Sequence, residues 1–296
     1  MSILNAIASV NVDQLSDMTA VKTGGGGRGL LPKGTALVRL CSYIEFGSHI
    51  QTFAGQAKPA APIFKLGFMI VGGVGLKEDG TPEKYVLEEG KFPMISTFDT
   101  TMSLHEKAKA VKYFNALNRV GNKATHFVQK VQEQCLYALP IGHKIATGGR
   151  NAGKTVQDID FAALQVALDQ ETGLPRTAPE LKEEHIQVFL WNQPSEAMWN
   201  SIYIEGEWDE VKDEKTGEVK YPKRSKNFLQ EKCLAAVDFE GSALQVLLSE
   251  LGTEYTMPEL PTAPEATPDV PAAPTEVPTG TVPAVPALDD TDDIPY

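Results

Sequence analysis

Cysteine is scarce in this chain and forms no metal-binding or disulfide pattern. Cys41, Cys135 and Cys233 stand far apart among 296 residues and form no C-x-x-C pair. Such spacing is typical of a protein in a reducing compartment and argues against a structural zinc site. The five histidines are scattered as well. We therefore expect no metal, no cofactor and no disulfide framework.

Long apolar runs are also missing. The longest mostly apolar stretch, residues 66–76, has about half of the ~20 residues that a membrane-spanning helix needs, and four of them are glycine, a composition unsuited to such a helix. Residues 1–17 carry acidic side chains and no basic ones, unlike a secretory signal. The sequence predicts no membrane association and a cytoplasmic location.

Basic residues are absent from one part of the chain. The formal net charge is −12, but residues 253–296 hold nine acids and no lysine or arginine, so the rest of the chain is nearly balanced. Half of the 20 prolines lie in the same segment. A segment with so few bulky apolar residues cannot offset the entropy cost of ordering, so we expect a disordered acidic tail.

Composition divides the chain into three regions. Residues 1–34 include the run TGGGGRG and are expected to form a flexible arm. Residues 35–252 have the pattern of a folded domain, with strands first, then helices, then strands again. This order predicts a mainly β or α+β fold: an OB-like antiparallel barrel with helical insertions. The disordered tail, 253–296, follows it.

Two stretches alternate as strands do. In residues 35–46 the outward face carries Arg39 and Tyr43, and in residues 63–71 the equivalent face carries Lys65. A cation beside an aromatic ring on the outer face of a barrel suits single-stranded nucleic acid, and an ordinary half-solvated sheet is the alternative. The residues expected on the apolar face of the first strand are Ala36, Val38, Leu40, Ile44 and Phe46.

Helices and a hairpin are expected between and after these strands. The longest helix should cover residues 103–117, because Ser103 and Glu106 have capping-box spacing. Residues 208–221 are expected to form a hairpin around Thr216 and Gly217. Further helices are predicted over 125–137, 225–236 and 241–251, and further strands over 91–100, 186–191 and 201–208.

Residues 148–155, GGRNAGKT, match the phosphate-loop pattern G-x-x-x-x-G-K-[ST]. Such a loop joins a buried strand to a helix, and residues 155–168 can supply the helix. Residues 140–147 mix proline, glycine, histidine and lysine where a buried parallel strand would be continuously apolar. A nucleotide hydrolase is thus one alternative. The favoured interpretation is a glycine loop whose Arg150 and Lys154 contact the phosphates of nucleic acid.

The stretch YPKRSKNF places three cations together. Lys223, Arg224 and Lys226 lie at the expected start of a helix capped by Ser225. Cations oppose the helix dipole at that end, whereas an anion is favoured there. The arrangement is consistent with a phosphate docking at this position, and a solvated basic turn is the alternative.

The final residues resemble the acidic tip of bacterial single-stranded DNA-binding proteins, which ends in Asp-Asp-Ile-Pro-Phe after a disordered linker. Bacteriophage single-stranded DNA-binding proteins have comparable tails behind an OB-fold body. Residues 224–248 and 189–208 also resemble stretches of phage replication-module proteins. Tyr296 replaces the terminal phenylalanine here. The residues that match the partner-docking tip are Asp289, Asp290, Asp292, Asp293, Ile294, Pro295 and Tyr296.

The resemblance implies a phage protein that coats single-stranded DNA with little sequence preference and recruits replication or recombination proteins through its tip. No nucleophile–base pair, paired acids or metal cluster can be assembled from the sequence, so we expect no enzyme activity. A protein-interaction adaptor that does not bind single strands is a further alternative. Strand annealing and self-association into a homo-oligomer remain open.

Overall fold

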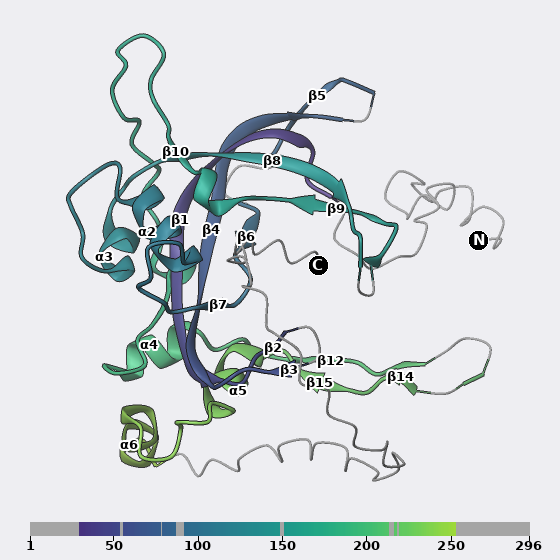
Figure 1. The fold of residues 1–296 in the computed structure, drawn as a ribbon, viewed down its shortest axis with the longest axis vertical. Helices are drawn as coiled ribbons and strands as arrows, with labels where there is room; N and C mark the ends of the chain where they lie inside the picture. The colour runs from purple at the N-terminus through teal and green to yellow at the C-terminus, as the bar shows by residue number, and fades with distance from the viewer. Residues whose placement is uncertain are drawn as a thin grey trace, which may run out of the picture. The chain divides into compact units, whose positions relative to one another are not determined.

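Two long paired strands form the centre of the fold. In the computed structural model, β1 (Lys33–His49) runs antiparallel to β4 (Ala61–Leu76), from the Lys33–Leu76 pair to the His49–Ala61 pair (Figure 1). The structure describes residues 30–252, apart from 54–55, 78, 87–91, 149–150, 213–215 and 218. Both strands lie where the alternating sequence predicts them. Residues 1–29 of the predicted N-terminal arm and the whole acidic tail, including the docking tip, lie outside the described residues, whereas Lys33 and Gly34, predicted as the end of that arm, begin β1.

Shorter strands extend this pair into a mixed sheet. β8 (Tyr137–Ile145) pairs antiparallel with the first half of β1, and β11 (Gln187–Phe189) pairs parallel with the second half. The path β10–β8–β1–β4–β5 is open, and no closed barrel forms among the described residues. The fold is therefore mainly β with added helices. The remaining strands of the sheet are β5 (Pro82–Lys84), β6 (Met94–Ser96), β7 (Thr100–Thr101), β9 (Thr155–Asp158) and β10 (Gln165–Val166). A separate small hairpin joins β2 (Thr52–Phe53) to β3 (Gln56–Ala57).

The helices are shorter than the sequence predicts. α2 begins at Lys109, not at Ser103, and its N-cap Ala108 makes no side-chain cap bond. α3 ends at Gln132, where Glu133 turns to extended backbone. The predicted helix over 155–168 is wrong, because β9, a single 3-10 turn, η3 (Phe161–Ala163), and β10 occupy it. The described helices and the other 3-10 turn are α2 (Lys109–Leu117), α3 (Phe127–Gln132), α4 (Glu196–Ser201), α5 (Phe228–Leu234), α6 (Ala243–Glu250) and η4 (Glu183–His185).

A β-bulge at Cys41 reverses the side-chain alternation of β1. Leu40 pairs with Phe68 but Ser42 pairs with Gly67, so Cys41 has no partner of its own in β4. One extra residue moves every later side chain to the opposite face. Tyr43 consequently joins Leu40 on one face of the sheet. The expectation that Ile44 continues the face of Leu40 is wrong.

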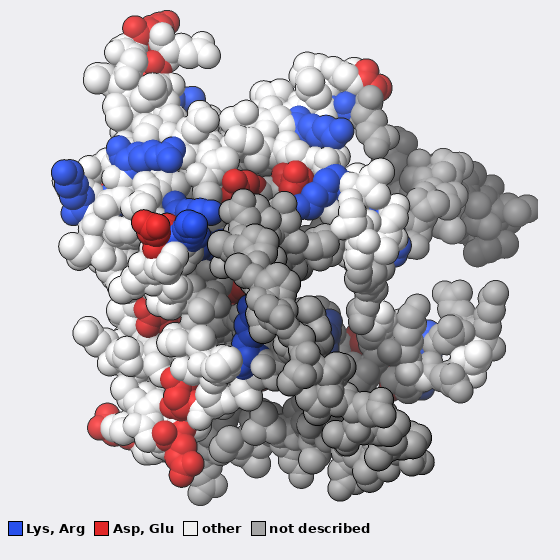
Figure 2. Space-filling view, in the orientation of Figure 1, with Lys and Arg blue, Asp and Glu red and all other residues white. Residues whose placement is uncertain are grey.

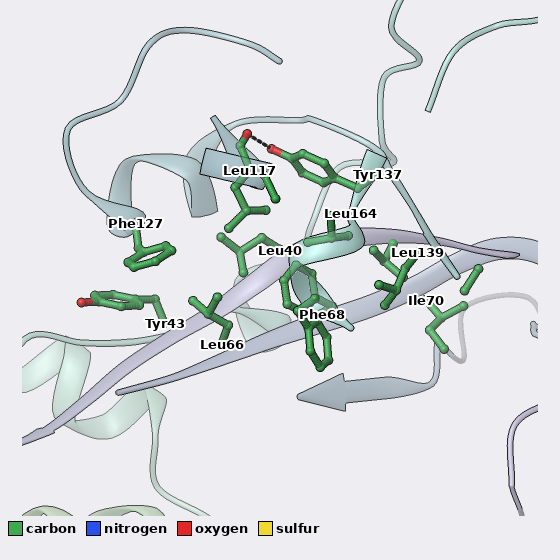
Figure 3. Close-up of a cluster of buried hydrophobic side chains, with 14 of the residues drawn as sticks. Leu40, Tyr43, Leu66, Phe68, Ile70, Leu117, Phe127, Tyr137, Leu139 and Leu164 are labelled. Atoms are coloured by element: carbon green, nitrogen blue, oxygen red, sulfur yellow. Dashed lines mark hydrogen bonds between the residues drawn. The ribbon is translucent and has the colours of Figure 1, made fainter. Parts of the chain in front are cut away.

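Each half of β1 therefore contributes to a different core. The first core contains Leu40 and Tyr43 and packs against α2, α3 and η3, and Figure 3 shows the Tyr137 hydroxyl donating to the carbonyl of Leu117 within it (2.8 Å). The second core contains Ile44 and Phe46, and α4, α5 and α6 complete it. Its other large members are Ile63, Phe189, Trp191, Trp199, Ile202, Leu229, Leu234, Phe239, Leu244 and Leu248.

Gly47, near the end of β1, is expected to tolerate no side chain. Its φ is +78°, and an added Cβ would lie 2.6 Å from Cζ2 of Trp191 and 2.8 Å from Cβ of Ala236. We expect Gly47→Ala to lower the free energy of unfolding by about 2–5 kcal/mol, the sum of left-handed strain and overpacking. Gly80→Ala is the matched control, since Gly80 has φ +82° but no atom within 4 Å of an added Cβ. Denaturant unfolding of both variants isolates the packing component, and equal losses would contradict the prediction.

Candidate nucleic-acid interface

A two-stranded arm, residues 207–225, carries exposed aromatic and basic side chains. It consists of β12 (Glu207–Trp208) paired with β15 (Arg224–Ser225), and β13 (Val211–Lys212) paired with β14 (Val219–Tyr221) (Figure 1). The predicted hairpin around Thr216 and Gly217 is thus confirmed, and Gly217 has the positive φ (+73°) that a tight connection requires.

Each face of the arm carries an aromatic ring and a basic side chain. Trp208 stands opposite Arg224, and Val211 stands opposite Tyr221, three residues further along each strand. Side chains alternate along a strand, so these two pairs lie on opposite faces. The ion pair between Lys223 and Glu207 (2.5 Å) agrees with this, because it places Lys223 on the face of Tyr221.

Arg224, Trp208 and Phe228 form what we call the Trp208 stack. The guanidinium carbon of Arg224 lies 4.8 Å from the centre of the Trp208 ring. The rings of Trp208 and Phe228 are 6.4 Å apart and inclined by 29°. Trp208 is 39 % exposed and Phe228 43 % exposed. Large rings that remain this accessible are available to stack on a ligand.

The positive charge of the arm is only partly neutralised. Glu207 raises the pKa of Lys223 by hydrogen bonding to its ammonium, and Lys212 lies 2.8 Å from Glu210. Arg224 and Lys226 have no acidic side chain within ion-pair distance in the described part of the chain. These two cations are therefore the ones best placed to meet a phosphate.

The predicted helix cap at Ser225 is wrong. Ser225 ends β15, and its hydroxyl accepts from the amide of Asn227 (2.9 Å), which is the N-cap of α5. The backbone amide of Lys226 donates to the carbonyl of Gly206 (2.9 Å) and so joins the two sides of the arm at its base. Lys223, Arg224 and Lys226 are brought together as expected, but by a β-ribbon instead of a helix terminus.

Arg39 does not lie on an exposed face. It is 4 % exposed, and its guanidinium donates to the carbonyl of Pro179 while Nε has no hydrogen-bond partner. Burial lowers its pKa. The segment that includes Pro179 covers the sheet here, which the local alternation of β1 does not reveal. Arg39 is therefore closed off from a strand of nucleic acid in this conformation.

Tyr43 is also buried, and it lies on the other face of the sheet from Arg39. The Cys41 bulge places it in the first core, where its ring is 5.4 Å from that of Phe127 (Figure 3). Its hydroxyl donates to Glu45 (2.6 Å), and burial is the main cause that raises its pKa. The expectation that Tyr43 is an exposed stacking residue is wrong.

Lys65 is half-buried and pairs with Ile44, on the face of the sheet that also carries Arg39. Lys65 belongs to the large sheet, whereas the strands of the arm form separate two-stranded sheets that do not pair with it. The structure thus does not join Lys65 to the cations of the arm in one continuous sheet surface.

GGRNAGKT connects two antiparallel strands. The amide of Gly153 donates to Ala146 (2.8 Å) and that of Ala146 to Lys154 (2.9 Å), closing the hairpin between β8 and β9. Thr155 begins a strand, whereas a phosphate loop must lead into a helix that helps to hold the anion. The stretch therefore lacks the structural setting of a nucleotide site. Lys154 lies exposed on this hairpin, and Arg150 lies outside the described residues.

Sequence reasoning missed the rings that the arm exposes. Trp208 and Tyr221 are 39 % and 48 % exposed, whereas Trp191 and Trp199 belong to the second core. Tyr203, which precedes the arm, is 55 % exposed. The exposure of Trp208 and Tyr221 could have been predicted from their position in the sequence. These residues are the two ends of the predicted hairpin, and a two-stranded ribbon cannot bury both of its faces. Figure 2 shows further Lys and Arg side chains over α2, α3, β8 and β9, and Asp and Glu over α4 and α6.

Two depressions lie elsewhere on the described surface. One, of about 660 Å³, is lined mainly by polar side chains of residues 121–135, and the other, of about 510 Å³, by apolar and charged side chains of residues 166–176 together with Leu37 and Ala138. Within the described residues no group of His, Cys, Asp and Glu could hold a metal ion. None of the described helices is long and apolar enough to span a bilayer.

No protein-family model, curated protein or solved structure matches this chain.

Proposed function

We propose that this chain binds single-stranded DNA with little sequence preference. The observation that carries the proposal is the arm, a two-stranded ribbon on which the exposed rings of Trp208 and Tyr221 lie together with the cations Lys223 and Arg224. Sequence-tolerant binding to single strands combines base stacking on aromatic rings with cations that follow the phosphates. Trp208 and Tyr221 would stack on bases, while Arg224 and Lys226 would contact phosphates.

The body and the tip take complementary roles in this proposal. The long bulged β1, paired along both edges, supports describing the body as an OB-like, partly open barrel with helical additions. The tip, residues 289–296, would recruit replication or recombination proteins, since its acids can steer a basic partner and its Ile-Pro-Tyr can fill an apolar pocket. The sequence resemblance supports a phage origin and action in the host cytoplasm.

A salt titration tests the binding. We expect the full chain to bind fluorescent oligo-dT, with log affinity falling linearly with log salt by about 0.7 for each phosphate contacted. An unlabelled single strand should displace the probe, and a duplex hairpin of equal length should displace it poorly. The duplex hides the faces of its bases from the rings of the arm.

Two results would count against the proposal. Absence of oligo-dT binding at low salt removes single-strand binding altogether, and the protein-interaction adaptor then becomes the better interpretation. If the duplex displaced the probe as well as the single strand does, the arm would bind nucleic acid through charge alone and not through base stacking. Labelled ATP in the same assay separately tests the hydrolase alternative, for which the 148–155 hairpin provides no phosphate-loop geometry.

A further inference from the structure

The indole of Trp208 is already covered by a planar cation. The guanidinium of Arg224 lies over the ring, and Phe228 lies roughly parallel to that ring from the start of α5. The guanidinium and a nucleobase are both flat and both stack on indole. Arg224 therefore occupies a position that a stacked base would need.

We propose that Arg224 controls access to Trp208: an unpaired nucleobase takes the place of the guanidinium on the indole, and the displaced guanidinium binds the adjacent phosphate. This inference rests on the proposed single-strand binding and specifies its first step. The ligand is an unpaired base with its flanking phosphate, because bases within a duplex expose only their edges.

The geometry allows Arg224 to move without unfolding the arm. Its backbone is paired with Trp208 in the β12–β15 ribbon, while its side chain is exposed. Glu207, next to Trp208 on the opposite strand, is neutralised by Lys223, and no described acidic side chain lies within ion-pair distance of Arg224. No described carboxylate thus holds the guanidinium over the ring, and a phosphate can draw it away.

The two states of Arg224 should leave a distinctive signature in a salt titration. At low salt the phosphate contact favours the native residue. At high salt that contact is screened, and the guanidinium only competes with the base. Removing Arg224 should therefore weaken binding at low salt and leave it equal or up to several-fold tighter at high salt.

The experiment compares the full-length chain with its Arg224→Ala, Arg224→Lys and Lys182→Ala variants on oligo-dT across salt concentrations. Lys182 is exposed, lies outside the arm and provides a control for loss of one positive charge. We expect the Arg224→Ala curve to be shallower by about 0.7 in slope and to meet or cross the wild-type curve at high salt. Arg224→Lys should retain the slope, because the charge remains. Lys182→Ala should follow the wild type. Acrylamide should quench tryptophan fluorescence more strongly in unliganded Arg224→Ala than in wild type.

Other outcomes overturn the inference. A constant loss at all salt concentrations, with unchanged slope, would make Arg224 a structural residue of the arm. If the Arg224→Ala curve coincided with that of the wild type, Arg224 would take no part in binding. In both cases wild-type binding persists, so the proposed function survives. Failure of the wild type itself to bind oligo-dT would remove the proposed function and this inference together.

Discussion

Trp208→Ala is expected to weaken binding of the full chain to oligo-dT by about 5- to 150-fold, which is the loss of one base stacked on an aromatic ring. Trp208 is the largest exposed ring of the arm, and β12 holds it in a fixed register opposite Arg224. Removing the ring eliminates a stacking surface but no charge. The salt slope should therefore remain close to that of the wild type while the affinity falls at every salt concentration.

Two further variants make this result specific. Leu174→Ala removes an exposed apolar side chain far along the sequence from the arm and should bind like the wild type. Trp208→Phe keeps an aromatic face and should recover most of the affinity. If Trp208→Ala bound as tightly as Leu174→Ala, the arm would not be the stacking surface.

Lys130→Met is expected to produce the second large effect, a loss of about 3–4 kcal/mol in the free energy of unfolding. The Lys130 side chain is fully buried, and its ammonium donates to the carbonyls of Val120 (2.9 Å) and Asn122 (2.6 Å) and to Glu133 (2.9 Å). Methionine fills similar volume but leaves the two carbonyls without this donor and the Glu133 carboxylate without its cation, although the Cys135 thiol still donates to that carboxylate (3.2 Å). Chemical denaturation measures the loss.

Lys123→Met provides the control, because Lys123 is exposed on the loop that Lys130 holds. It should change stability by less than about 0.5 kcal/mol. Adding Glu133→Gln to Lys130→Met should restore part of the stability, since the unpaired carboxylate is then gone. A loss below about 1 kcal/mol for Lys130→Met would show that the loop replaces these bonds with water.

The central strands were predictable because β1 and β4 are long, apolar and alternating, features that depend only on local sequence. The face of the sheet on which each later side chain of β1 lies was not predictable. The Cys41 bulge depends on how β1 and β4 pair, and nothing in residues 39–43 alone marks one residue as extra. A single unpaired residue was enough to move Tyr43 from the expected surface into a core.

The candidate site divides in the same way. Thr216 and Gly217 predicted the hairpin, and the basic residues near 223–226 were recognised as a group. That Arg224 would lie over Trp208 depends on the register between two segments 16 positions apart, which local patterns do not contain. Arg39 was misplaced for a related reason, because the covering segment at Pro179 is distant in sequence.

The bulge in β1 also has a consequence for cooperativity. β1 and β4 run without interruption through both cores, and the bulge lets the same two strands present Leu40 to one core and Ile44 to the other. If either core loosened, part of the β1–β4 pairing that also supports the other core would be lost. Proteins open locally in contiguous units that share such elements. The two cores should therefore open as one unit, and the separately paired arm can fluctuate without disturbing them.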